Sequence, residues 1–193
     1  MIFPEEHVVL VDEDNNVIGT MPKAAVHSAS TPLHRGFSIF LFDEDGRLLL
    51  QQRSRAKKTW PLAWSNSCCG HPGLDEPDED AARRRVRFEL GAEAGDVRLL
   101  LPYRYRCVKD GVMENEICPV LVGRIVADDV RANTDEVEAV RWIAWEDFLM
   151  EFGSDPGKVS PWCQEEARLL DASVAFGTFR KNTTKETSIS GRN

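Results

Sequence analysis

The segment between Pro77 and Gly91 carries the strongest helix signal in the chain and limits what the rest can form. Pro77 stands at its start, acidic residues fill the first turn, no glycine occurs up to Leu90, and Gly91 follows the end. This asymmetry is typical of an α-helix, because proline fits the first turn and glycine readily ends it. The apolar runs on either side are short. Short strands around such a helix predict a mixed α/β domain.

Short apolar runs bounded by turn residues predict the strands. They cover residues 7–11, 17–21, 37–42, 48–53, 97–108, 112–126 and 138–143. The first four are expected to form two hairpins, and a turn at 109–111 joins 97–108 to 112–126. Further helices are predicted at 23–27, 145–152 and 161–174.

The length of 193 residues suits one hydrophobic core. We expect a single compact domain over residues 1–176. Residues 177–193 are mostly polar and aperiodic, which predicts a disordered tail.

Charge and cysteine content narrow the function. A net charge of -8 disfavours a nucleic-acid surface, and no apolar run approaches membrane-spanning length. The N-terminal residues show no signal-peptide pattern. Five cysteines, two of them adjacent, favour free thiols in a reducing compartment. We therefore expect a cytoplasmic protein, a monomer or weak homodimer, with a small-molecule substrate and neither nucleic-acid nor membrane partners.

Basic residues nevertheless form two local clusters. They are Arg53, Arg55, Lys57 and Lys58 in the first, and Arg83, Arg84, Arg85 and Arg87 in the second. The two clusters could converge on one small anion, or they could simply be solvated faces.

The helix belongs to a longer pattern with fixed spacing. Gly70 is followed after five residues by Glu76, and after seven more by Arg84 and the run to Ala92. This resembles the Nudix box, in which helix carboxylates hold divalent cations against a diphosphate. Two acidic positions of the box are changed here, to Arg85 and Phe88, and Glu89 remains. The pattern favours binding a diphosphate through one Mg²⁺ without cutting it. The plainer interpretation of Arg85 and Glu89 is a surface ion pair worth about 0.3–0.5 kcal/mol.

Histidines and carboxylates suggest a second, metal-binding group. Glu114 and Glu116 would share one face of a strand, where paired acids need a metal or a counter-charge unless they are solvated. With His27, His34 and His71 they form a plausible shell for Zn²⁺, Mn²⁺ or Co²⁺, which accept imidazole better than Mg²⁺ does. Each residue alone is more commonly structural.

Several motifs together resemble the type I isopentenyl-diphosphate isomerases over residues 7–176. The motifs are His27, Leu33-His34, Arg53, Lys57-Lys58-x-Trp60-Pro61, Trp64-x-Asn66-Ser67-x-Cys69-Gly70-His71-Pro72, Arg104-Tyr105, Glu114-Asn115-Glu116-x-Cys118-Pro119 and Ser160-Pro161-Trp162. The resemblance implies a Nudix-like α/β/α sandwich with a mixed sheet. It also implies interconversion of isopentenyl and dimethylallyl diphosphate, in isoprenoid precursor synthesis.

The resemblance further implies a role for each matching residue. A tightly bound divalent metal (Mn²⁺, Zn²⁺ or Mg²⁺) would be held by His27, His34, His71, Glu114 and Glu116. A second ion, Mg²⁺, would bridge Glu89, the carbonyl of Cys69 and the substrate diphosphate. The diphosphate would contact Lys23, Arg53, Lys57 and Arg85. Catalysis would use Cys69 and Glu116 as the acid/base pair, Tyr105 beside the glutamate, and Trp162 over the reacting carbons.

The reaction chemistry agrees with two opposed acid/base groups. An allylic C–H is too weak an acid for direct removal, so the alkene must be protonated first, giving a tertiary carbocation. We expect Glu116, with Tyr105, to donate at C4 and Cys69 to accept at C2. An aromatic face stabilises such a cation by about 2 kcal/mol when dry. The plainer interpretations are a core anchor for Trp162 and a small buried thiol for Cys69.

Two alternative functions remain open from the sequence. One is a Nudix hydrolase of a nucleoside diphosphate derivative, which would need the acidic helix that Arg85 and Phe88 interrupt. The other is a non-catalytic phosphate-binding or metal-storage domain, which would have no use for Cys69 and Glu116.

Overall fold

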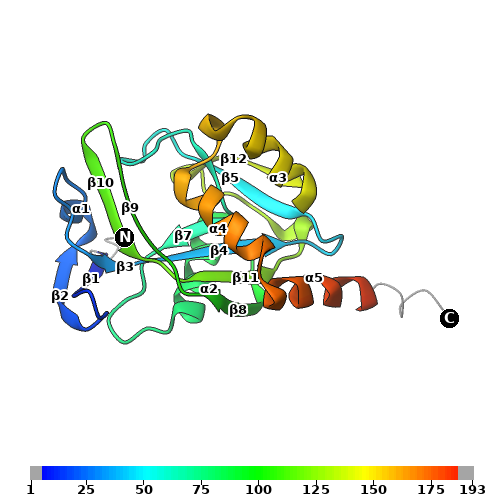
Figure 1. Cartoon of the computed structure of the whole chain (residues 1–193), viewed down its shortest axis with the longest axis horizontal. Coiled ribbons are helices and arrows are strands. Elements are labelled where there is room, and N and C mark those ends of the chain that lie inside the picture. Colours follow the sequence, from blue (N-terminus) through cyan, green and yellow to red (C-terminus); the bar gives the residue numbers. More distant parts are fainter. Residues whose placement is uncertain (1–5, 187–193) are drawn as a thin grey trace.

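The computed structural model describes residues 6–186 (Figure 1). The strands are β1 (His7–Val11), β2 (Val17–Pro22), β3 (His34–Arg35), β4 (Phe37–Phe42), β5 (Leu48–Arg53), β6 (Trp64–Ser65), β7 (Cys68–Gly70), β8 (Gly95–Leu101), β9 (Arg104–Lys109), β10 (Val112–Ile117), β11 (Val120–Arg124) and β12 (Val137–Ile143). The helices are α1 (Lys23–Val26), α2 (Asp78–Leu90), α3 (Trp145–Ser154), α4 (Pro161–Asp171) and α5 (Val174–Glu186), with 3-10 turns at Ala127–Asp129 and Pro156–Lys158. Within the described part, no helix is both long and apolar enough to cross a membrane.

The larger of the two sheets is covered by helices on both faces. Its order is β12-β5-β4-β11-β8. Alternate residues of β4 point to opposite faces, as a strand requires. Phe37, Ile39 and Leu41 pack in the cluster that includes α2, whereas Phe40 and Phe42 pack in the cluster that includes α3, α4 and α5. The structure therefore confirms the predicted α/β/α sandwich (Figure 1).

The second sheet, in the order β2-β1-β3-β10-β9, lies beside the first and carries His34 on β3 and both Glu114 and Glu116 on β10. In it β10 pairs with β3 in parallel and with β9 antiparallel. The predicted β9–β10 turn is present, and both Asp110 (φ 51°) and Gly111 (φ 78°) are left-handed, as a tight hairpin turn requires. The predicted first hairpin, β1–β2, is also present.

The prediction of unbroken strands at 97–108 and 112–126 is wrong. The first run divides into β8 of the large sheet and β9 of the small sheet. The second divides into β10 of the small sheet and β11 of the large sheet. The divisions fall at Pro102 and Pro119. Proline has no N–H to donate to a strand ladder, so each run changes sheet at its proline. These two crossings add to the earlier one, where the chain passes from β3 of the second sheet to β4 of the first.

The predicted β4–β5 hairpin is paired only next to its turn, at Phe42 and Leu48. Beyond that pair, β7 pairs with β4 and β6 pairs with β5 in the space between them. Ser67 joins the two sides, because its Oγ accepts from Leu41 N at 2.7 Å and donates to Leu49 O at 2.6 Å. The opened hairpin places the segment that carries Cys69 in the middle of the fold.

Helix α2 agrees with its prediction and ends at Gly91 (φ 66°). The Gly91 N–H caps the helix by donating to Arg87 O at 3.1 Å. A Cβ at this position would lie 2.7 Å from Arg131 O, so only glycine satisfies both the turn and the close approach.

The C-terminal segment differs from its prediction. Helix α4 ends at Asp171 and α5 continues the fold to residue 186, through residues that were expected to be a disordered tail. Phe176 and Phe179 are both buried in the core cluster, which stabilises α5 against the sandwich. Residues 187–193 of the predicted tail lie outside the described residues.

Candidate active site

A cavity of about 430 Å³ brings together most of the residues that the sequence singled out. Those lining it are Lys23, His27, Arg53, Lys57, Cys69, His71, Arg85, Tyr105, Glu114, Glu116 and Trp162. The two other candidates, His34 and Glu89, are buried next to the cavity. His34 contacts Glu116, and Glu89 contacts Arg85. Cys69 comes from β7 in the large sheet, and Glu116 comes from β10 in the small one.

Three histidines and Glu116 form a group that can hold a metal ion. One ligand atom from each of His27, His34, His71 and Glu116 lies within 4.8 Å of all the others. Nε2 of His34 and Nε2 of His71 are 3.3 and 3.2 Å from Oε1 of Glu116. Glu114 joins from the same face of β10, with its Oε2 2.9 Å from Nε2 of His27.

The donor atoms in this group fit a divalent cation. Nδ1 of His34 donates to the Pro32 carbonyl at 2.9 Å, so a neutral ring presents the lone pair of Nε2 to a metal, whereas a protonated ring donates from Nε2 to Glu116. That Nε2 and Oε2 of Glu114 are buried without a hydrogen bond of regular geometry. Buried polar atoms that converge without hydrogen-bond partners are what a metal site shows when its ligands are preformed. Burial alone would raise the pKa of Glu116, but hydrogen bonds from His34 and His71 hold it well below its usual value.

The thiol of Cys69 lies in a different environment. Sγ donates to Oδ1 of Asn66 at 3.2 Å and lies 3.5 Å from Oγ of Ser38. Burial, followed by the charge of Glu166, raises the pKa of Cys69 to about 12. The resting residue is therefore a neutral thiol, which can donate a proton and can accept one only as the thiolate, opposite a carboxylate that is ionised.

Aromatic rings line one wall of the cavity. Tyr105 stacks on Trp162 with ring centroids 5.7 Å apart, and Trp60 meets Trp162 edge to face at 5.2 Å. Tyr103 also stacks on Tyr105, with ring centroids 5.8 Å apart. Trp162 is 3% exposed, so it is both part of the core and part of the cavity wall. Faces of this kind can stabilise a cation by cation–π attraction.

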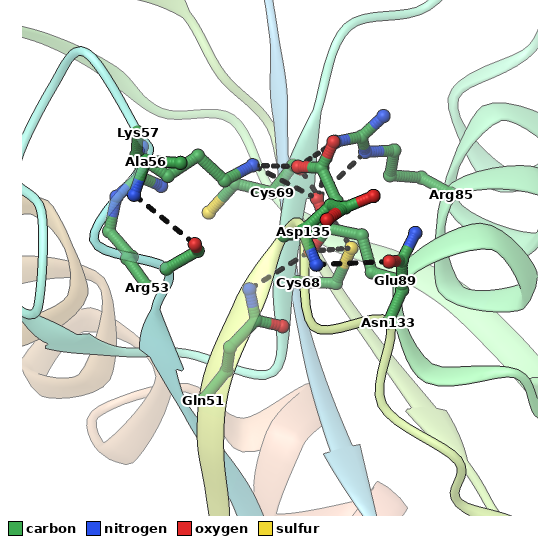
Figure 2. Close-up of polar contacts among 12 residues, drawn as sticks. Gln51, Arg53, Ala56, Lys57, Cys68, Cys69, Arg85, Glu89, Asn133 and Asp135 are labelled. Atoms are coloured by element: carbon green, nitrogen blue, oxygen red, sulfur yellow. Dashed lines mark hydrogen bonds and ion pairs between the residues drawn. The ribbon is translucent and has the colours of Figure 1, made fainter.

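Three of the four candidate diphosphate-binding cations are held in ion pairs. Lys23 pairs with Glu6, and Arg85 bridges Glu6, Glu89 and Glu136 at 2.7–3.2 Å. Lys57 also reaches Glu136 and, at 3.5 Å, Glu89. Figure 2 shows Lys57 and Arg85 reaching in from opposite sides. Arg53 is held separately, donating to the carbonyl of Thr59.

Glu89 is the remaining carboxylate of the box and is 1% exposed. Gln51 Nε2 donates to it at 2.9 Å, and the thiol of Cys68 lies 3.5 Å from its Oε2 (Figure 2). Burial alone would raise the pKa of Glu89, but Lys57 and Arg85 hold it below its usual value. Cys68 and Cys69 are neighbours on β7 and point to opposite sides, so only Cys69 opens into the cavity.

Sequence reasoning did not single out several residues of this region. Glu166 of α4 is completely buried, and this burial, with the further effect of the Glu116 charge, raises its pKa well above the usual value. Its position four residues after Trp162 places both on one helix face, which was a usable signal. Glu136 precedes β12 in a loop, and nothing in the sequence marked it.

Comparison with known proteins agrees with this geometry. Residues 32–163 match the NUDIX domain family. An isopentenyl-diphosphate Delta-isomerase of Mycolicibacterium vanbaalenii is 50% identical over 172 residues, covering 87% of this chain and 93% of the relative. A protein of the same name from Klebsiella pneumoniae is 44% identical, covering 90% of this chain and 95% of the relative.

The chain belongs to the isopentenyl-diphosphate Delta-isomerase family of Nudix proteins. The crystal structure of DR0079 from Deinococcus radiodurans matches with a TM-score of 0.66 and 23% identity, over 84% of this chain and 98% of that one. At this identity the likeness supports the fold alone. The two changed positions of the Nudix box contact each other in the structure. Arg85 is buried against Glu89, and the guanidinium of Arg85 lies over the ring of Phe88, with 4.9 Å from Cζ to the ring centroid.

Proposed function

We propose that the protein interconverts isopentenyl and dimethylallyl diphosphate by adding one proton to the alkene and removing another. The observation that carries the proposal is one cavity lined by Cys69, Glu116, Trp162 and five lysine and arginine side chains. A thiol and a carboxylate from different sheets can act on a flat five-carbon unit between them. The relatives' printed name supports the same reaction.

The proposed steps use the chain's own residues and start once the resting Cys69 thiol has passed its proton to the Glu116 carboxylate. The protonated Glu116, with the Tyr105 hydroxyl beside it, delivers a proton to C4, so that the double-bond electrons form the new C–H bond and leave a tertiary cation at C3. The Cys69 thiolate then accepts a proton from C2, and the electrons of that C–H bond form the new double bond, which returns both groups to their resting protonation states. The faces of Trp162 and Tyr105 stabilise the cation and exclude water.

Two divalent ions complete the proposed site. His27, His34, His71, Glu114 and Glu116 would hold one, and their mixed imidazole and carboxylate donors favour Zn²⁺ or Mn²⁺ over Mg²⁺. Glu89 and the carbonyl of Cys69 would hold Mg²⁺ with the substrate. When bound, the ions supply positive charge that stabilises ionised carboxylate and diphosphate oxygens. Lys23, Arg53, Lys57 and Arg85 orient the diphosphate, for which Lys23, Lys57 and Arg85 exchange their present carboxylate partners and Arg53 its bonds to Thr59.

The hydrolase alternative is disfavoured by the box helix. Multi-metal hydrolysis needs a row of carboxylates, and here Arg85 fills one position as a buried cation. We further propose a prenyl diphosphate as the only class of partner, without nucleic acid or membrane, and a monomer or weak homodimer. The five free cysteines support a cytoplasmic location within a reducing compartment.

One incubation tests the proposed reaction. Purified protein is given isopentenyl diphosphate, Mg²⁺ and deuterated water, and the products are examined by NMR. We expect dimethylallyl diphosphate with deuterium in the methyl group that arises from C4. Release of inorganic phosphate or pyrophosphate with no isomerised product would show a hydrolase instead.

A further inference from the structure

The side chain of Asn66 uses every hydrogen-bonding position that an amide has. Nδ2 donates to Ile39 O at 3.2 Å and to Cys68 O at 2.9 Å. Oδ1 accepts from Ser65 Oγ at 2.8 Å and from Cys69 Sγ at 3.2 Å. The residue is 1% exposed, so water does not compete for these bonds. An amide offers two donors and two acceptor positions, and all four are filled.

This arrangement fixes which way the amide faces. If the amide were turned over, Oδ1 would meet the two backbone carbonyls of Ile39 and Cys68, which cannot donate. The orientation therefore follows from the backbone, and Oδ1 must face Cys69. Because Oδ1 is only an acceptor, the hydrogen between it and Sγ belongs to the thiol.

The same network reaches the aromatic wall. The single hydroxyl hydrogen of Ser65 goes to Oδ1 of Asn66, so Ser160, whose Oγ lies 2.8 Å from Oγ of Ser65, donates to it. Ser160 is the residue before α4, the helix that carries Trp162 in its first turn, and its N–H donates to Trp64 O at 2.8 Å. Cys69 and Trp162 are thus tied to one buried chain of hydrogen bonds.

We propose that Asn66 is a positioning residue that sets the direction of the Cys69 thiol and ties it to the start of α4. The proposal rests on the proposed isomerase function, because it assumes that the thiol takes part in proton transfer. It also explains Asn66 and Ser160, two parts of the sequence motifs that the proposed catalytic and metal roles leave unused.

Two variants at one position separate positioning from simple stability. Asn66→Ala and Asn66→Asp both lose the Nδ2 donors to Ile39 O and Cys68 O, but only the aspartate keeps an oxygen for Sγ. We expect Asn66→Ala to lower kcat about 100-fold, because a misplacement of about 1 Å can cost that much. KM and metal content should stay near those of wild type, and Asn66→Asp should recover much of the lost kcat. Equal losses in the two variants would overturn the proposal.

A spectroscopic measurement on the wild-type protein does not depend on how the variants fold. The S–H stretching band of Cys69 is isolated as the infrared difference between wild type and Cys69→Ala. We expect a band shifted to lower wavenumber, as a thiol donating to a carbonyl gives, and a band at the position of a free thiol would contradict the proposal. If wild type does not isomerise the substrate at all, the proposed function fails, while the S–H band still reports on the Asn66 bond.

Discussion

Arg85 and Glu89 form a buried ion pair one helical turn apart, with Nη2 of the arginine 2.7 Å from Oε1 of the glutamate. Their exposures are 4% and 1%, so the interpretation of this pair as a surface ion pair is wrong. A surface pair would contribute little, whereas two buried charges depend on each other for their stability. In this helix the pair also replaces part of the carboxylate row of a hydrolase.

Removing the arginine should destabilise the fold. Arg85→Met would leave Glu89 and Glu136 without a major counter-charge, and breaking one partner of a buried pair costs about 3–5 kcal/mol. The free energy of unfolding in urea measures the loss. Arg85→Lys keeps the charge but loses the two-pronged geometry of the guanidinium, so its free energy of unfolding should lie between those of wild type and Arg85→Met. A methionine variant within about 1 kcal/mol of wild type would contradict the buried-pair interpretation.

The adjacent cysteines offer a matched pair of variants. Cys69→Ala removes the thiol that opens into the cavity and should abolish measurable isomerisation while leaving metal content and diphosphate binding unchanged. Cys68→Ala removes a thiol that is 1% exposed on the other side of the strand and should keep most of the activity. Initial rates of product formation check both. A Cys69→Ala protein with the wild-type rate would remove the thiol from the mechanism.

Metal removal should affect stability as well as activity. A preformed ligand group binds the ion only in the folded state, so metal at 100 times its Kd should stabilise the protein by about 2.7 kcal/mol. Thermal unfolding with and without a chelator, together with elemental analysis, measures this difference. His34→Gln should lose most of the metal-dependent shift. His7→Ala changes the one histidine outside the group and should keep the full shift.

Stability should depend on pH through Glu166. Its folded-state pKa is raised above the usual value of 4.5, mainly by burial. Below pH 4.5 both states carry the proton; above it the unfolded state releases the proton and the folded state keeps it, so wild-type stability falls as pH rises. Glu166→Gln removes this cost. Its advantage over wild type should grow between pH 5 and 8 by at most about 1.4 kcal/mol per pH unit.

Urea denaturation at several pH values tests this prediction. Glu165→Gln changes an exposed carboxylate on the same helix and serves as the control. An advantage of Glu166→Gln that does not change with pH would show that the Glu166 carboxyl ionises equally in both states.

The sequence predicted those helices and turns that are marked by residues at their own ends. Helix α2 follows from Pro77, its acidic first turn and Gly91, and the β9–β10 turn follows from Asp110-Gly111. The exchange of strands between sheets was missed, since hydrophobic pattern does not show which neighbour a strand pairs with. Pro102 and Pro119 were the available signals. The extension of α5 was missed because a polar run follows Phe179, and the burial of Phe176 and Phe179 depends on the helices that they pack against.

Some residues of the candidate site could likewise be predicted from the sequence, and others could not. Motif resemblance selected residues that the fold brings to one cavity, including His27, Glu116 and Cys69. The resemblance supplied no reason to assign a role to Asn66, whose importance lies in the direction of its amide. Glu136 and Glu166 were missed because their effect comes from packing beside charges that are distant in the sequence.

The chain crosses from one sheet to the other at Pro102 and at Pro119, and the two proposed proton-transfer groups stand on opposite sides of that seam. The distance between Cys69 and Glu116 therefore depends on how the two sheets pack against each other. The hydrogen bonds within either sheet alone do not fix it. Mild denaturant that loosens this packing would widen that distance first. Turnover should then cease while the far-ultraviolet spectrum still reports intact strands and helices.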